Sequence, residues 1–318
     1  MKQTTALGHS TLKINRMGLG CMGMSEFYGS FDKEESISTL HKAIDLGVNF
    51  FDTADMYGSG ANEQLLGEAF RGRWDELILA TKFAVVRGPH GEFLGLSGKP
   101  AYIREACDQS LKRLGTDCID LYYMHRQDPE VPIEEIVGTM AELVQQGKVK
   151  NLGLSEVDTE TLRKAHATHP ITALQTEYSL WSREPEAEIF KVCEELGITF
   201  VAYSPLGRGF LTGAIKSRAD LEAGDFRLGN PRFTDEAIKE NLKFVEVIEQ
   251  IAESKGMTKA QVALAWILNQ NDEITVIPGT RKMNRLQENL RAFEVDLTEE
   301  DLATIEAHVP SGTVGARY

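Results

Sequence analysis

Apolar residues along this chain gather in short unbroken runs that follow amphipathic segments. Four times, a helix-prone stretch ends in a glycine, and an apolar β-prone run begins within a few residues. A glycine at a helix end supplies the left-handed cap from which the chain turns back toward a strand. Apolar runs that do not alternate with polar residues are typical of parallel strands covered by helices. The pattern therefore predicts alternating helices and parallel strands.

Eight such runs are candidate strands, and all but the first are flanked by helical patterns. They cover residues 17–20, 48–52, 77–82, 118–125, 149–155, 173–178, 198–203 and 274–279. Eight strand and helix units in order predict an α/β fold, a closed (β/α)8 TIM barrel. No linker rich in Pro, Gly or Ser divides the chain, which favours one domain over residues 1–318. Residues 2–14 predict a short β-hairpin ahead of the first barrel strand.

Three connections are long: residues 84–98, residues 204–233 and the tail 309–318. Long loops without secondary structure in a compact domain are usually lids or binding loops. The first two follow the carboxyl ends of strands, where the active sites of such barrels are built. We therefore expect a functional site at that end of the barrel.

Charge and composition exclude several classes of partner. The formal net charge is -14 and the pI is near 5.1, so the field of the protein repels nucleic acid and anionic membranes. Any phosphate ligand must then be met by a local cationic cluster. The first residues lack the apolar region of a secretory signal, and we find no apolar run long enough to cross a bilayer. Four cysteines without a C-x-x-C pair favour reduced thiols and a cytoplasmic location.

Three consecutive predicted strands end in an ionisable residue: Asp52, Lys82 and His125. Any one of them, taken alone, is more simply explained as a strand reaching solvent. Three such residues on one rim of the barrel favour a functional site. Tyr57 follows Asp52 by five positions, among turn-forming residues, so the turn carries a phenol to the same rim. No H-x-H or H-E-x-x-H motif is present there, and we expect no metal.

These residue types fit proton transfer to a carbonyl oxygen. A free tyrosine has a pKa of about 10, which is too high for ready proton transfer near neutrality. The ammonium of Lys82 would lower it, and Asp52 would keep that ammonium charged. His125 would donate an N–H to the carbonyl oxygen and fix its direction. Tyr57 is thus predicted to be the general acid.

Seven stretches together resemble the aldo-keto reductase superfamily over essentially the whole chain. They are GVNFFDTADMYGSGANEQLLGEAF, LILATKF, LKRLGTDCIDLYYMH, GKVKNLGLSE, ALQTEYSL, AYSPLGRGFLTG and IPGTRKMNRLQENL. The resemblance implies a catalytic tetrad of Asp52, Tyr57, Lys82 and His125. It also implies hydride transfer from the nicotinamide C4 of NADPH to the carbonyl carbon of a small molecule, with protonation of the oxygen by Tyr57. YSLW and SPLGRG look most like the bacterial and plant branch that reduces aldehydes, including pyridoxal-type and indole-alkaloid-type aldehydes.

The same resemblance implies the cofactor contacts. Ser155 and Gln175 match groups that hold the nicotinamide carboxamide, and Tyr203 matches the ring that stacks on the nicotinamide. Glu156 stands where family members often carry Asn. The residues expected along the pyrophosphate are Ser204, Leu206, Gly207 and Arg208. Those expected at the adenosine end are Gly279, Thr280, Arg281, Arg285, Glu288 and Asn289. Arg281, Lys282 and Arg285 form the cationic cluster that an acidic chain needs for the 2'-phosphate, so NADPH is preferred over NADH.

Two alternatives stay open. Trp181 is either a wall of the substrate pocket, together with Tyr57 and His125, or a packing residue. The function is either carbonyl reduction or that of a cofactor-binding, redox-reporting subunit, similar to the potassium-channel β subunits built on the same barrel. The intact tetrad favours the enzyme. The sequence carries no pattern that predicts the oligomeric state.

Overall fold

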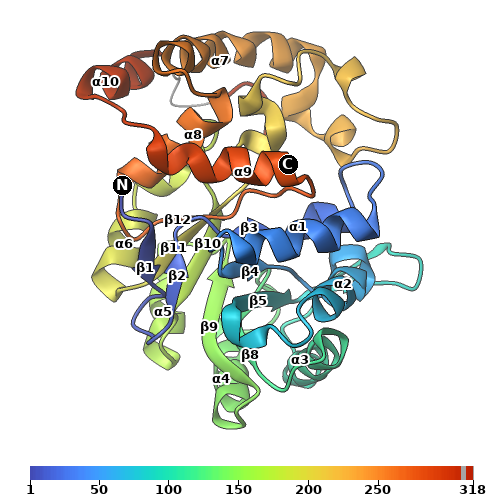
Figure 1. Cartoon of the computed structure of the whole chain (residues 1–318). Coiled ribbons are helices and arrows are strands. Elements are labelled where there is room, and N and C mark those ends of the chain that lie inside the picture. Colours follow the sequence, from blue (N-terminus) through green and yellow to red (C-terminus); the bar gives the residue numbers. More distant parts are fainter. Residues whose placement is uncertain (309–312, 318) are drawn as a thin grey trace.

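Eight parallel strands form the centre of the computed structural model, which describes residues 1–308 and 313–317 (Figure 1). Each strand lies within or overlaps a run predicted from the sequence. In spatial order the strands are β3 Leu19–Gly20, β4 Phe50–Asp52, β5 Ile78–Phe83, β8 Ile119–Met124, β9 Val149–Ser155, β10 Ala173–Glu177, β11 Thr199–Tyr203 and β12 Thr275–Val276. The predicted α/β barrel is therefore confirmed.

The barrel closes between its first and last strands. Parallel bridges join Met17 to Val276 and Gly20 to Gly279. The N–H of Gly18 donates to the carbonyl of Val276 at 2.9 Å. A Cβ on Gly20 would lie 2.9 Å from the carbonyl oxygen of Ile277, so glycine allows the backbones to approach here.

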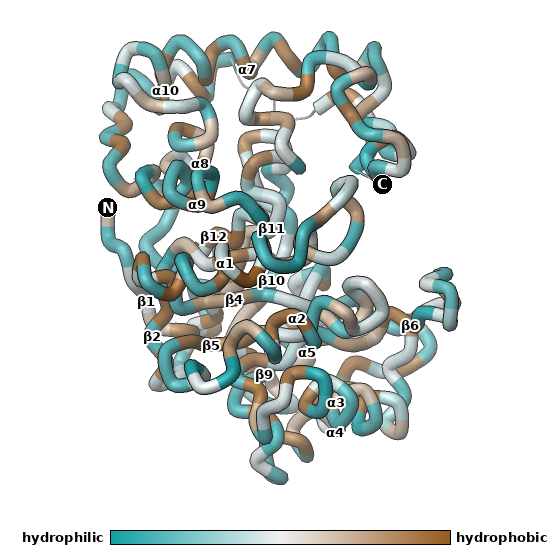
Figure 2. The backbone as a smooth tube through the Cα atoms, turned by 45° about the vertical axis from the view of Figure 1, so that its right-hand side comes forward, coloured by the Kyte–Doolittle hydropathy of each residue, from teal (hydrophilic) through white to brown (hydrophobic). Residues whose placement is uncertain are grey.

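Helices surround the strands, and the glycines predicted to end four of the helical segments all have positive φ. These are Gly47, Gly115, Gly147 and Gly197, with φ of 86°, 69°, 72° and 60°. The helices are α1 Lys33–Asp45, α2 Ala61–Ala69, α3 Pro100–Leu114, α4 Ile133–Gln145, α5 Thr159–Thr168, α6 Ile189–Leu196, α7 Asp235–Lys255, α8 Lys259–Gln270, α9 Met283–Leu290 and α10 Glu299–His308. Figure 2 shows apolar and polar residues alternating along these helices. Their buried apolar residues join strand residues in the larger core cluster, with α7 packed on α8 and α10 packed on α7.

The predicted hairpin is present as β1 Thr4–Ala6 and β2 Lys13–Asn15, paired antiparallel. Leu7 and Ile14 belong to the core cluster formed by residues inside the barrel, such as Phe50. The N–H of Gly8 donates to the hydroxyl of Thr199, the first residue of β11, at 2.7 Å. The hairpin therefore covers the amino ends of the strands and leaves the carboxyl ends for a site.

The two long internal loops contain more structure than the sequence predicted. Residues 84–98 hold an antiparallel hairpin of β6 Val85–Arg87 and β7 Phe93–Leu96, whose turn is held by Arg87 Nε donating to the Gly91 carbonyl at 2.8 Å. Residues 204–233 contain short 3-10 helices: η5 Gly207–Thr212, η6 Arg218–Asp220, η7 Phe226–Gly229 and η8 Pro231–Phe233. Elsewhere in the described part of the chain, short 3-10 helices are η1 Met22–Met24, η2 Tyr57–Gly60, η3 Trp74–Glu76, η4 Glu184–Glu186 and η9 Arg291–Glu294. Of the predicted tail loop, residues 309–312 and 318 lie outside the described residues.

A search of the described part of the chain finds no helix with the length and apolar character needed to span a bilayer.

Candidate active site

A buried ion pair lies at the carboxyl ends of β4 and β5. Lys82 Nζ donates to Asp52 Oδ1 at 2.5 Å and to the carbonyl of Thr53 at 2.7 Å. Gln175, from β10, donates its amide N–H to the other carboxylate oxygen of Asp52 at 2.7 Å. Burial lowers the pKa of Lys82, and the charge and hydrogen bond of Asp52 offset part of that effect. The ammonium is thus fixed in direction by two partners at the end of the neighbouring strand β4, and Gln175 from β10, across the barrel, holds the carboxylate.

Tyr57 lies over this pair. It begins η2, five residues after the end of β4, and is 7% exposed. Lys82 Nζ is 5.3 Å from the centre of the phenol ring. The rings of Tyr57 and His125 meet edge to face, with centroids 5.8 Å apart and an interplanar angle of 86°. The structure therefore brings together all four residues of the predicted tetrad.

His125 follows directly after β8 and is buried. Burial, and then the charges of Lys82 and Arg126, hold the pKa of its imidazole well below the usual value of 6.5. Its Nδ1 is a buried atom without a hydrogen-bond partner among the described residues. At neutral pH the ring is uncharged, so it carries a single N–H that can be presented to a carbonyl oxygen.

Arg126 is a site residue that the sequence analysis missed. Its Nη1 donates to the carbonyl of His125 at 2.7 Å and to the hydroxyl of Ser155 at 3.2 Å. Ser155 ends β9, the next strand of the barrel. Its position in the sequence, directly after His125 at the end of a predicted strand, could have identified it.

Glu177, at the end of β10, is a second missed residue and lies at the centre of a buried charge cluster. Its carboxylate accepts from Arg208 at 3.0 Å and from Arg232 at 3.3 Å. Arg317, near the carboxyl end of the chain, lies 3.3 Å from the same carboxylate and also pairs with Glu156. The charge of Glu156, which departs from the family pattern, is therefore balanced by Arg317.

The residues expected near the nicotinamide and pyrophosphate lie around this cluster. Arg317 also donates to the hydroxyl of Tyr203 at 3.3 Å. Ser204, directly after β11, and Gly207, the first residue of η5, have positive φ, of 49° and 55°, and Leu206 precedes that helix. The side chain of Arg208 is turned inward to Glu177.

Trp181 occupies a packing position. Its side chain is 3% exposed and its ring lies 4.2 Å from that of Phe210 and 5.5 Å from that of Phe233, measured between centroids. A Cβ on Gly207 would approach the Trp181 ring to 2.5 Å. Trp181 thus packs against the loop that follows β11.

The residues expected at the adenosine end lie together where β12 leads into α9. Arg281 donates to the carbonyls of Tyr28 at 3.0 Å and Gly23 at 3.3 Å, which brings it to the loop after β3. Arg285 is exposed in the first turn of α9, and Lys282 pairs with Glu35 at 2.7 Å. The other expected residues here are Gly279, bridged to β3; Thr280, whose hydroxyl accepts from the Lys282 N–H; Glu288, half-buried in α9; and Asn289, buried in α9.

Aromatic rings line the rim beside Tyr57, and the sequence analysis did not predict them. Phe27 meets Tyr57 edge to face, with centroids 6.5 Å apart, and Phe226 at 5.8 Å. Tyr28 and Phe226 are 5.1 Å apart, and the N–H of Phe226 donates to the carbonyl of Phe27 at 3.3 Å. The loop after β3 and the loop after β11 therefore meet next to the tetrad.

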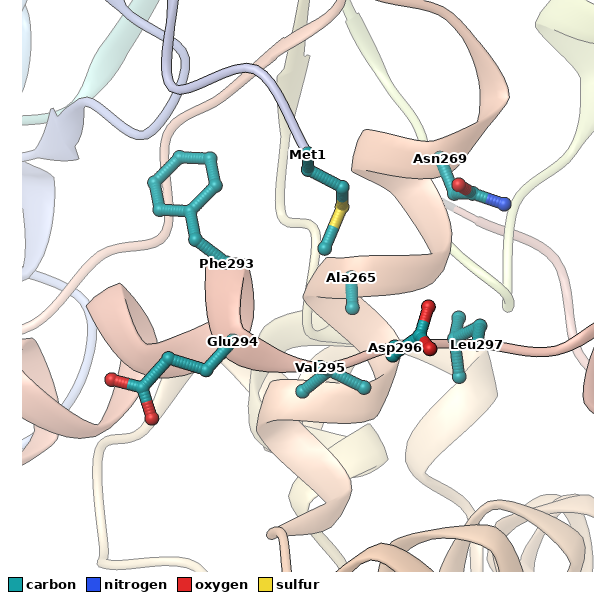
Figure 3. A pocket seen from close by; sticks show the side chains of 8 residues that line it. All are labelled: Met1, Ala265, Asn269, Phe293, Glu294, Val295, Asp296 and Leu297. Atoms are coloured by element: carbon teal, nitrogen blue, oxygen red, sulfur yellow. The ribbon is translucent and has the colours of Figure 1, made fainter.

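A surface hollow elsewhere on the molecule lies between Met1, α8 and η9 (Figure 3). Its lining includes Ala265, Asn269 and Phe293, and none of the residues described above. It is separate from the site at the strand ends.

A parallel α/β barrel with a lysine, a carboxylate, a phenol and a neutral imidazole at the carboxyl ends of its strands is the arrangement of a carbonyl-transforming oxidoreductase. The chain belongs to the aldo/keto reductase family, whose model matches residues 16–310.

Curated relatives cover nearly the whole chain. It is 46% identical to the aldo-keto reductase yakc [NADP(+)] of Schizosaccharomyces pombe, over 99% of this chain and 94% of that protein. It is 44% identical to probable aldo-keto reductase 1 of Glycine max, over 99% of this chain and 92% of that one.

Solved structures show the same fold. A glycerol dehydrogenase from Gluconobacter oxydans superposes with a TM-score of 0.88 at 27% identity, covering 97% of each chain. An aldo/keto reductase from Klebsiella pneumoniae, in complex with NADP and acetate, has a TM-score of 0.76 at 26% identity, covering 100% of this chain and 99% of that one. The family identification made from the sequence is confirmed.

Proposed function

We propose that this protein reduces aldehydes and ketones to alcohols with NADPH and that Tyr57 donates the proton to the carbonyl oxygen. The observation that carries the proposal is the buried Asp52–Lys82 pair, 2.5 Å between its charged atoms, placed 5.3 Å from the Tyr57 ring centre and beside a neutral His125. Family membership and the Schizosaccharomyces pombe relative named for NADP(+) support it.

The residues of the chain fit a nicotinamide dinucleotide phosphate. Although the net charge is -14, cationic side chains gather at the first turn of α9, where Arg285 is exposed and Arg281 is half-buried. Guanidinium groups at a helix amino end suit a phosphate. Ser155, Gln175 and Tyr203 would hold the nicotinamide, and the turn at Ser204–Arg208 would approach the pyrophosphate. When bound, NADPH supplies the hydride that the carbonyl carbon accepts.

Each tetrad residue has a distinct task in moving the proton. The Tyr57 hydroxyl gives its proton to the carbonyl oxygen as negative charge develops there. The Lys82 ammonium stabilises the phenolate that remains, and Asp52 keeps that ammonium charged despite its burial. The neutral His125 donates its N–H to the same carbonyl oxygen and fixes its direction.

The substrate is expected to carry an apolar or aromatic body. Phe27 and Phe226 stand on the rim next to Tyr57, and rings of this kind bind apolar groups while few polar groups fix the orientation. Aldehydes with aromatic rings, including pyridoxal-type aldehydes, fit this description. The four free cysteines support a cytoplasmic location for the enzyme.

A panel of carbonyl compounds tests the proposal. NADPH consumption is followed by absorbance with aromatic, aliphatic and cofactor-derived aldehydes, and NADPH binding is measured separately by fluorescence. Steady turnover, highest with the aromatic members, is expected. Tight NADPH binding without turnover of any member contradicts the proposal and favours a redox-reporting subunit.

A further inference from the structure

We infer that Glu26 and Arg87 are positioning residues that hold the turn carrying Tyr57 over Lys82. The inference rests on the proposed role of Tyr57 as proton donor. Neither residue belongs to the tetrad or to the expected cofactor contacts, and they come from two loops at the barrel rim: Glu26 from the loop after β3 and Arg87 from the β6–β7 hairpin.

The two side chains form a paired clamp around Tyr57. Arg87 Nη2 lies 2.7 Å from Glu26 Oε1, and Arg87 Nη1 lies 2.8 Å from Glu26 Oε2, a bidentate pair. Arg87 Nη1 also donates to the carbonyl of Met56 at 2.9 Å, and Glu26 Oε2 accepts from the N–H of Gly58 at 2.7 Å. The backbone is thus held on both sides of Tyr57 by one ion pair.

The turn needs such a clamp because its backbone is unfavourable on its own. Gly58, Ser59 and Gly60 all have positive φ, of 56°, 50° and 92°, which is unfavourable for Ser59 but not for the two glycines. A non-glycine residue in the left-handed region costs conformational energy and persists where surrounding contacts hold it. Ser59 is exposed, so its own side chain is not packed into that conformation. The contacts on Met56 and Gly58 supply part of the required support.

The clamp also connects Tyr57 to its neighbours on the rim. Arg87 is itself fixed by its Nε–H, which donates to the Gly91 carbonyl at 2.8 Å. Glu26 directly precedes Phe27, whose ring meets the Tyr57 ring edge to face. Loss of the Glu26–Arg87 pair therefore frees both the turn that carries Tyr57 and the neighbouring Phe27 ring. The buried Asp52–Lys82 pair keeps its own partners.

Kinetics of Glu26→Ala, Glu26→Gln and Arg87→Met test the inference with an aldehyde that the wild type reduces. A catalytic group displaced by about 1 Å can cost on the order of 100-fold in rate, so kcat should fall about 10- to 100-fold in Glu26→Ala and Arg87→Met. The Kd for NADPH and the Tm should stay close to wild type. Glu26→Gln should lose less, because its amide oxygen still accepts from Gly58. The double variant Glu26→Ala/Arg87→Met should lose little more than the worse single, since both remove one interaction.

The matched control is Glu142→Ala, which removes the partner of Arg104 in another Arg–Glu pair, between α3 and α4, and should leave kcat unchanged. Wild-type kcat in both Glu26→Ala and Arg87→Met overturns the inference. The inference is also overturned if every variant, including the mild Glu26→Gln, loses kcat together with NADPH affinity and Tm. That result would indicate a general structural role for the pair. Tyr57→Phe separates the two levels. If that variant keeps its activity, the proposed function fails; if it is inactive while the clamp variants are active, only this inference fails.

Discussion

Gln175 and Lys82 hold the two oxygens of the Asp52 carboxylate from opposite sides. The amide of Gln175 donates to Oδ2 at 2.7 Å, and the ammonium of Lys82 donates to Oδ1 at 2.5 Å. All three side chains are buried. Both oxygens of the carboxylate therefore have fixed partners. By holding the carboxylate, Gln175 also fixes the position of the Lys82 ammonium below Tyr57.

Gln175→Leu should destabilise the fold. It leaves Oδ2 of Asp52 buried without a donor, which costs about 1–3 kcal/mol for an unsatisfied polar group. Denaturant unfolding measures the change in the free energy of unfolding. Gln270→Leu is the control, because that residue is exposed and its amide donates to a carbonyl of its own helix, that of Trp266. Equal stability of the Gln175 and Gln270 variants would contradict the described contact.

Asp52→Asn should be less stable than the double variant Asp52→Asn/Lys82→Met. Removing one partner of a buried ion pair leaves an uncompensated charge and costs about 3–5 kcal/mol, whereas removing both charges avoids that penalty. Both variants should lose most carbonyl reduction. The free energies of unfolding of the wild type, both single variants and the double variant give the coupling directly. Additive losses would show that the two groups are not a pair.

His125 should make the fold sensitive to acid. Its folded pKa lies well below that of the unfolded chain, about 6.5, so below that pH the unfolded state binds a proton that the folded state does not. The stability that the fold gains from keeping His125 neutral is fully present above about pH 6.5. As the pH falls below that value, the free energy of unfolding decreases by up to about 1.4 kcal/mol per pH unit.

A His125→Gln variant isolates this effect. The stability difference between wild type and variant should be constant above about pH 7 and shift in favour of the variant below about pH 6. Unfolding curves across this range provide the test. A difference that does not change with pH would mean that His125 does not stay neutral in the fold.

Arg281→Ala should weaken binding of NADPH far more than binding of NADH. A hydrogen bond to a charged group contributes about 1.5–3 kcal/mol, so the Kd for NADPH should rise about 10- to 100-fold while that for NADH changes little. Fluorescence titration with each cofactor measures both constants. Arg291→Ala, an exposed arginine at the other end of α9 that pairs with Glu294, is the control. Equal effects on the two cofactors would remove Arg281 from the 2'-phosphate site.

The sequence predicted the barrel and the meeting of Asp52, Tyr57, Lys82 and His125 at one rim because both depend on local patterns. The apolar runs and the glycines after them mark strands and helix ends, and Asp52, Lys82 and His125 each stand where a strand ends. The hairpin β6–β7 was missed because its strands are only three and four residues long and half of β7 is exposed. The sequence therefore has no helix-end glycine followed by a long apolar run here, which is the pattern by which most of the barrel strands were found.

Contacts between distant residues were beyond the sequence analysis. Glu26 pairs with Arg87, 61 positions away, and Glu156 pairs with Arg317 near the carboxyl end. A single charged residue in a loop carries no local signal of its partner, because the pairing depends on how the strands order the loops around the rim. Glu156 drew attention as a departure from the family pattern, but the balancing charge became visible only in the fold.

The central claim is that the phenol of Tyr57 supplies the proton. The most direct test compares wild type and Tyr57→Phe in two measurements, the steady-state rate of aldehyde reduction and the Kd for NADPH. General acid catalysis contributes about 10²- to 10⁴-fold, so we predict a rate loss in that range with NADPH binding nearly unchanged. A variant that reduces the aldehyde at the wild-type rate would contradict the account.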